Sequence, residues 1–170
     1  MTTDQQVKRI YVASSWRNPL QPSVVALLRE FGHEVYDFRN PAPDQKGFAW
    51  RDCISGVDAK TIPSYLQVIR SDRAEAGFGL DKNALDWCDT CVIVLPCGRS
   101  AHLEAGYAAG QGKKVYVLLH ETQFEPELMY LLCTGITADV MQVVEWLQSS
   151  PRAGTGGVAD CASDHTMRSP

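Results

Sequence analysis

The stretch Thr90-Cys-Val-Ile-Val-Leu95, followed at once by Pro96-Cys-Gly-Arg-Ser100, decides the fold of this chain. A short continuous apolar run between turn signals is typical of a strand that is buried on both faces, as in a parallel sheet. The tight loop leads into a helix that we expect Ser100 to cap and that ends at Gly110 or Gly112. Strand, loop and helix together predict one α/β unit.

The same strand-then-helix order recurs on both sides of this unit. Further strands are predicted at 8–14, 33–38 and 115–119, with a weaker one at 133–136. Helices are predicted at 19–31 with Asn18 as cap, and at 61–71, 81–87, 125–132 and 137–149. The alternation predicts an α/β fold of one doubly wound parallel sheet, with four to five strands and helices on both faces.

Length and charge bound the organisation and the partners. The 170 residues suggest a single domain over residues 1–149, and the Pro-, Gly- and Ser-rich residues 150–170 are predicted to form a disordered tail. A net charge of −4 disfavours a nucleic-acid polymer as partner, because a phosphate backbone calls for a basic surface. A single nucleotide needs only one local anion site and is therefore still allowed.

The chain offers no signal for a membrane or for a cofactor. It has no run of about 20 apolar residues, and its start lacks the apolar region of a signal peptide, so we expect a cytoplasmic location. Cys88 and Cys91 form a CxxC, but no second pair follows at zinc spacing. The six cysteines (Cys53, Cys88, Cys91, Cys97, Cys133, Cys161) are expected to be free thiols, and neither metal nor cofactor is predicted.

Ligands of open parallel sheets bind beyond the carboxyl ends of the strands, which selects the loops at 14–18, 39–50, 96–100 and 120–124. The loop at 96–100 feeds a helix N-terminus, where free N–H groups favour an anion. Trp50 could stack on a base or seal its loop onto the core. The predicted substrate-binding residues are Ser14, Ser15, Arg17, Trp50, Gly98, Arg99 and Ser100, although Ser14, Ser15 and Arg17 could equally serve only to form a turn.

Two carboxylates are candidates for catalysis. Glu104 lies one helical turn after Ser100, where the helix dipole is expected to keep its carboxylate ionised for attack on a sugar carbon. Asp81 is expected to open a helix whose start lies on the same side of the sheet, so that it could be a second catalytic carboxyl or only an N-cap. Paired carboxyls at one mouth are the working groups of glycoside cleavage.

Several of these segments resemble the nucleoside 2-deoxyribosyltransferase superfamily. They are Ile10-Tyr-Val-Ala-Ser-Ser-Trp-Arg-Asn18, the stretch from Asp81 to Leu95, Gly98-Arg-Ser-Ala-His-Leu-Glu104-Ala-Gly-Tyr-Ala, and Lys113-Lys-Val-Tyr-Val-Leu-Leu119. Their order and spacing carry the resemblance, which covers about residues 8–147. The loop Cys97-Gly-Arg-Ser departs from the Gly-rich form that is usual in the superfamily.

The resemblance implies a flavodoxin-like fold and a homodimer or higher homo-oligomer. It implies that Glu104 is the nucleophile on the anomeric carbon, that Asp81 assists departure of the base, and that Ser15, Ser100 and Arg17 bind a 5′-phosphate, as in the 2′-deoxynucleoside 5′-phosphate N-hydrolase branch. Three functions stay open: a nucleotide N-glycosidase, a deoxyribosyltransferase that exchanges bases, and a sensor that binds nucleotides without turnover.

Overall fold

A five-stranded parallel sheet forms the centre of the protein, in a computed structural model that describes residues 6–50, 61–122 and 125–149. The strand order is β2-β1-β3-β4-β5, which is the flavodoxin-like order and confirms the expected fold class. The strands are β1 (Arg9–Ala13), β2 (Glu34–Tyr36), β3 (Thr90–Val94), β4 (Lys114–Leu118) and β5 (Gly135–Thr137). The expected tail, together with Cys53 and Cys161, lies outside the described residues.

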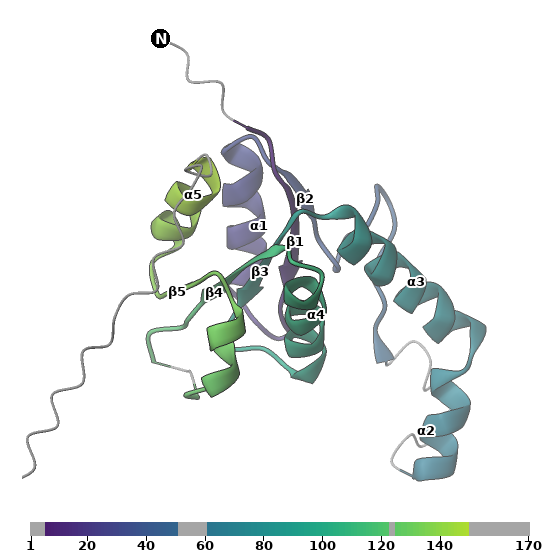
Figure 1. Cartoon of the computed structure of the whole chain (residues 1–170). Helices are drawn as coiled ribbons and strands as arrows, with labels where there is room; N and C mark the ends of the chain where they lie inside the picture. The colour runs from purple at the N-terminus through teal and green to yellow at the C-terminus, as the bar shows by residue number, and fades with distance from the viewer. Residues whose placement is uncertain (1–5, 51–60, 123–124, 150–170) are drawn as a thin grey trace, which may run out of the picture.

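Helices cover both faces of the sheet (Figure 1). One face packs against α1 (Gln21–Glu30) and α5 (Val140–Gln148), while the other packs against α3 (Asp72–Trp87) and α4 (Arg99–Gly110). Because side chains alternate along a strand, Ile10 and Val12 of β1 enter the first core, whereas Tyr11 and Ala13 enter the second. Both faces of β1 and β3 are therefore apolar, as the continuous hydrophobic runs predict.

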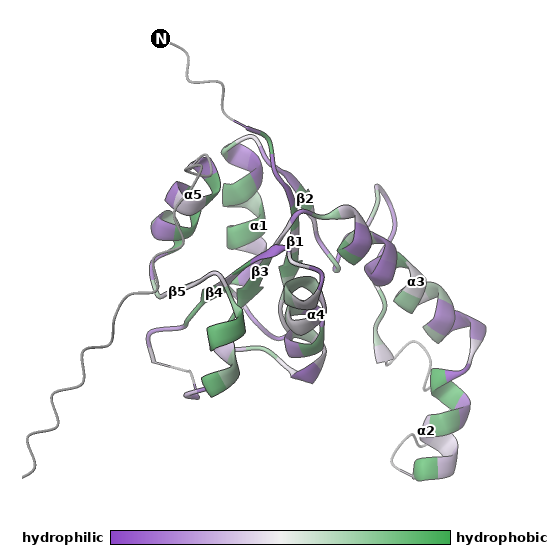
Figure 2. Cartoon of the chain, in the orientation of Figure 1, coloured by the Kyte–Doolittle hydropathy of each residue, from purple (hydrophilic) through white to green (hydrophobic). Residues whose placement is uncertain are grey.

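One arm of the molecule projects away from the sheet (Figure 1). It consists of α2 (Ile62–Ile69) and the first half of α3, and its apolar side chains include Ile62 and Phe78, which are 76% and 68% exposed. Figure 2 shows apolar residues on α2 and on the 3₁₀ helix η2 (Leu128–Leu132), which lies near α4. Among the described residues, both α2 and η2 thus carry exposed apolar side chains.

The helix expected at 81–87 is longer than predicted. It begins at Asp72, where the Ser71 hydroxyl caps it by accepting from the Ala74 N–H, so Asp81 neither opens nor caps a helix. The glycines at 77 and 79 resemble helix breakers in the sequence. Gly77 has a packing reason instead, since a Cβ there would lie 2.7 Å from the Phe48 side chain.

Two predicted helix caps are also wrong. The helix α4 begins at Arg99 with Gly98 as its N-cap residue, so Ser100 lies inside the first turn and caps nothing. The helix α1 begins at Gln21, with Leu20 before it rather than Asn18. The buried Asn18 side chain accepts from the Leu20 N–H just before α1, and it also donates to the carbonyls of Val94 and Pro96, which joins the first loop to the third. The Leu95–Pro96 peptide bond in that third loop is cis.

The remaining boundaries differ little from expectation. The segment predicted as a helix at 125–132 is the 3₁₀ helix η2, and α5 starts only after Asp139, whose side chain accepts from the Met141 N–H.

Within the described ranges, no helix is long and apolar enough to cross a bilayer. Cys88 and Cys91 are buried free thiols, and no group of three potential metal ligands occurs among the described residues.

Candidate active site

Two acidic side chains meet over the sheet face that α3 and α4 cover. Glu104 comes from α4 and Asp81 from the interior of α3, and both are partly buried. Burial, and after it the nearby charge of Asp81, raise the pKa of Glu104 to about 7. The prediction that these two residues share one site therefore has a physical basis, because their charges interact.

The helix dipole does not keep Glu104 ionised, contrary to the expectation from the sequence. Glu104 is the sixth residue of α4, and the effect of a helix dipole fades within the first turn. Burial and a like charge then dominate, and both favour the protonated carboxyl. Because the charge of Asp81 raises the pKa of Glu104, a state with one ionised and one neutral carboxyl is favoured over a state with two charges.

Asp81 has a defined partner. The hydroxyl of Tyr36, the last residue of β2, donates a hydrogen bond of 2.8 Å to Asp81 Oδ1. Burial raises the pKa of Asp81, while the Tyr36 hydrogen bond opposes part of this rise. Asp81 therefore holds its proton more strongly than an exposed aspartate does, which is the property that a carboxylic acid catalyst needs.

Two tyrosines that sequence reasoning missed line this site. Tyr11 of β1 stacks on Tyr36 with ring centroids 5.3 Å apart. The Tyr11 hydroxyl is close enough to Glu104 to favour its ionised form, yet it is buried and has no hydrogen-bond partner among the described residues. It is a polar atom that a bound ligand could satisfy. In the sequence both residues look like ordinary aromatic side chains of strands.

The first loop is held from several sides. The Ser14 hydroxyl donates to Val94 O at 2.8 Å, and Ser15 Oγ accepts from the Arg17 N–H at 3.2 Å. The guanidinium of Arg39 donates to three carbonyls of this loop, those of Ser15, Trp16 and Asn18. Ser14 and Ser15 therefore help to shape the loop, while the Arg17 side chain is exposed and available to a ligand.

Trp50 lies between Phe48 and Tyr65, and the three rings form a row of aromatic side chains, called the aromatic surface. Its ring packs edge-on against Phe48 at 5.2 Å and lies 6.0 Å from Tyr65 of α2. The Phe48 carbonyl accepts a hydrogen bond from the indole of Trp16, so this surface is also tied to the first loop. Trp50 is 42% exposed, and it can both seal its loop and offer a face to a base.

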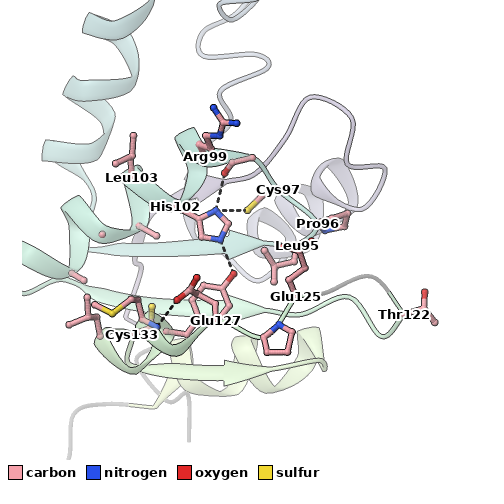
Figure 3. Close-up of a pocket in the computed structure, with 18 residues that line it drawn as sticks. Leu95, Pro96, Cys97, Arg99, His102, Leu103, Thr122, Glu125, Glu127 and Cys133 are labelled. Atoms are coloured by element: carbon pink, nitrogen blue, oxygen red, sulfur yellow. Dashed lines mark hydrogen bonds between the residues drawn. The ribbon is translucent and has the colours of Figure 1, made fainter.

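The N-terminus of α4 opens onto a cavity of about 1040 Å³ (Figure 3). Gly98 and Arg99 line it, and no side chain caps the helix, so free backbone N–H groups are left there. His102 lies in the wall, with Nδ1 2.9 Å from Gly98 O and Nε2 2.9 Å from the Tyr130 hydroxyl. Glu104 is not among the residues that line this cavity.

The structure thus brings together part of the predicted site. Glu104 and Asp81 form one cluster with the two tyrosines, whereas Gly98 and Arg99 line the cavity at the N-terminus of α4. Ser100 is exposed in the first turn of the same helix, near the expected anion site. The sequence carried no direct signal for the missed residues, because Tyr11 and Tyr36 become neighbours only through the register of two parallel strands.

No protein-family model matches the sequence, and no curated protein matches it. Among solved structures, the chain is similar to a 2-deoxyribosyltransferase from Bacillus psychrosaccharolyticus at 18% identity, with a TM-score of 0.49 over 79% of this chain and 88% of that one. It is also similar to the CMP N-glycosidase BcmB of Clostridium botulinum at 18% identity, with a TM-score of 0.46 over 82% and 98%. The assignment of a function therefore rests on the side chains of this chain.

Proposed function

We propose that the domain over residues 1–149 is an N-glycosidase that hydrolyses the N-glycosidic bond of a (deoxy)nucleoside 5′-monophosphate. The observation that supports it best is the coupled pair of partly buried carboxyls, Glu104 and Asp81, which have raised pKa values and come from two different helices. Glycoside cleavage with a covalent intermediate needs one ionised carboxylate as nucleophile and one neutral carboxyl as acid. We propose that these two roles are divided in the complex with substrate, where Glu104 is ionised and Asp81 holds the proton.

In the proposed mechanism, the Glu104 carboxylate attacks the anomeric carbon while the bond from this carbon to the base nitrogen breaks. The bond electrons leave with the base, which takes a proton from Asp81. Water then attacks the same carbon and breaks the ester to Glu104, while the Asp81 carboxylate accepts a proton from the water. The products are free base and sugar phosphate, and both carboxyls return to their starting state.

Recognition of the 5′-phosphate is proposed for Ser14, Ser15, Arg17, Gly98, Arg99 and Ser100. Two exposed guanidinium groups and an uncapped helix N-terminus supply positive potential near the carboxyl ends of β1 and β3. Trp50 is proposed to pack on the base, which is supported by its exposed ring in a row of aromatic side chains.

A homodimer or higher homo-oligomer is also part of the proposal. The support is the set of large apolar side chains left exposed around α4 and η2, of which Leu103, Leu128 and Leu131 are 76%, 75% and 79% exposed. Light scattering after size exclusion tests this point. A monomer at micromolar concentration would contradict it.

The function is tested with a panel of ribo- and deoxyribonucleoside 5′-monophosphates and the corresponding nucleosides. Free base and sugar phosphate are quantified with and without a second free base. We expect net sugar phosphate release from at least one monophosphate, which Glu104→Gln abolishes. Base exchange without net sugar release would replace the hydrolase by a transferase, and tight nucleotide binding without any cleavage would replace it by a sensor.

A further inference from the structure

We propose that Tyr36 is a positioning residue that holds Asp81 Oδ1 by hydrogen bonding, so that Asp81 carries its acid proton on Oδ2 and is stabilised as a carboxylate once that proton has left. This inference rests on the proposed function and gives one further residue a defined part in it. Tyr36 contacts Asp81, and of these two residues the sequence pattern suggested only Asp81.

The geometry fixes Tyr36 on two sides. Its backbone belongs to β2, which pairs with β1 in register so that Tyr36 lies beside Tyr11. The two rings stack with an interplanar angle of 19°, and the Tyr36 hydroxyl reaches Asp81 Oδ1 at 2.8 Å. A ring held by a strand and by a second ring has little freedom to turn, so the hydroxyl is a fixed donor.

The Tyr36 hydroxyl stays a donor over the whole working pH range. Burial and the charges of Asp81, Glu104 and Asp37 all raise the pKa of Tyr36 well above its ordinary value. A hydroxyl that is permanently protonated and directed at Oδ1 leaves Oδ2 as the oxygen that carries the acid proton.

The surroundings of Asp81 make this donor important. The groups that face the pair are Glu104 from α4 and Tyr11 from β1, while Asp37, immediately after β2, accepts from Gln21 of α1 and acts on Tyr36 only through its charge. The charged members of this set are acidic, so none of them stabilises a carboxylate at position 81. When Oδ2–H passes its proton to the departing base, the new charge on Asp81 is stabilised by the Tyr36 hydrogen bond.

The test compares Tyr36→Phe with a matched control, Tyr107→Phe. Tyr107 of α4 donates an equal 2.8 Å hydrogen bond to Asp86, which lies on the same helix as Asp81 but outside the site. Both substitutions remove one hydroxyl and keep the ring. The measurements are kcat and KM for the best nucleotide across the pH range, with thermal unfolding of both variants to compare their stability.

We expect Tyr36→Phe to lower kcat by about 10- to 100-fold with KM changed by less than about threefold. The alkaline limb of the kcat profile should move to higher pH, because Asp81 without its donor keeps its proton more strongly. Tyr107→Phe should match the wild type in both respects. A Tyr36→Phe variant with unchanged kcat, or with a lower kcat and an unchanged profile, would overturn the inference alone; a wild type that cleaves no nucleotide would overturn the proposed function as well.

Discussion

Two aspartates on α3 show how differently one type of contact can act in one helix. Asp81 and Asp86 each accept a hydrogen bond of 2.8 Å from a tyrosine hydroxyl, the first from Tyr36 and the second from Tyr107. The pKa of Asp81 is raised, because burial outweighs its hydrogen bond. The pKa of Asp86 is lowered to about 2.

The difference comes from the surroundings. Asp86 is exposed, and its lowered pKa is caused first by Lys82, whose ammonium lies 2.5 Å from Oδ2, and then by Tyr107. Asp81 has no such cation to offset burial, and its carboxyl lies close to Glu104. Asp86 is therefore a solvated anion, whereas Asp81, five positions earlier on the same helix, is a carboxyl that holds its proton more strongly. The difference teaches that a tyrosine hydrogen bond alone does not set the pKa of an aspartate, which depends also on burial and on a neighbouring cation.

The largest expected effect is on turnover. Glu104→Gln should lower kcat by at least about 10³-fold and Asp81→Asn by about 10²-fold or more, since the first lacks the nucleophile and the second the acid. Asp86→Asn on the same helix should retain wild-type kcat, measured as free base released per enzyme. Equal losses for Asp81→Asn and Asp86→Asn would erase the distinction between the two aspartates.

The next effect is on stability and has a defined sign. The native pKa of Glu104, about 7, is above its ordinary 4.5, so the folded protein holds this proton more tightly than the unfolded chain. The stabilisation is fully present below pH 4.5 and is lost as pH rises through 7. It amounts to at most about 3 to 4 kcal/mol for a shift from 4.5 to about 7. Urea unfolding at pH 5 and pH 8 should show Glu104→Gln gaining on the wild type at the higher pH, and no such gain would contradict the burial of this carboxyl.

A smaller effect concerns the coupling inside the pair. Asp81→Asn removes a like charge, so the pKa of Glu104 should fall, while remaining above 4.5 because burial is the larger cause. Carboxyl ¹³C NMR of Glu104 across pH measures this directly. Asp86→Asn should leave the Glu104 titration in place, and a shift of equal size in both variants would argue against a specific pair.

The smallest effect tests the exposed member. Lys82→Gln should raise the pKa of Asp86 toward its ordinary value, because Lys82 is the largest cause of the lowering. Turnover and the titration of Glu104 should not change. The same NMR titration detects it, and a change in kcat would show that the exposed pair is linked to the site after all.

The sheet could be predicted from the sequence because its signal is local. Continuous apolar runs such as Thr90–Val94 have no other stable place than a strand covered on both faces. The start of α3 could not be found in the same way, since Gly77 and Gly79 read as breakers. The reason for Gly77 is the side chain of Phe48, which is distant in sequence and reaches this helix only in the folded chain.

The site divides along the same line. Glu104 and Asp81 could be proposed from residue type, position and resemblance, although both of the physical reasons offered, the dipole and the helix start, are wrong. Tyr11 and Tyr36 could not be proposed, because their roles depend on strand register and on a contact with α3. The partner of a strand and its register depend on residues far apart in the sequence, so the sequence of one strand does not reveal them.

Arg39 has a consequence for how this architecture can be exchanged between proteins. Its guanidinium holds three carbonyls of the loop at 15–18, so the conformation of that loop depends in part on a residue outside it. A chimera with a crossover between residues 18 and 39 would separate the loop from its template, even if both parents were well folded. Recombination is therefore better tolerated outside this interval, and a graft of the loop into another scaffold has to include the arginine.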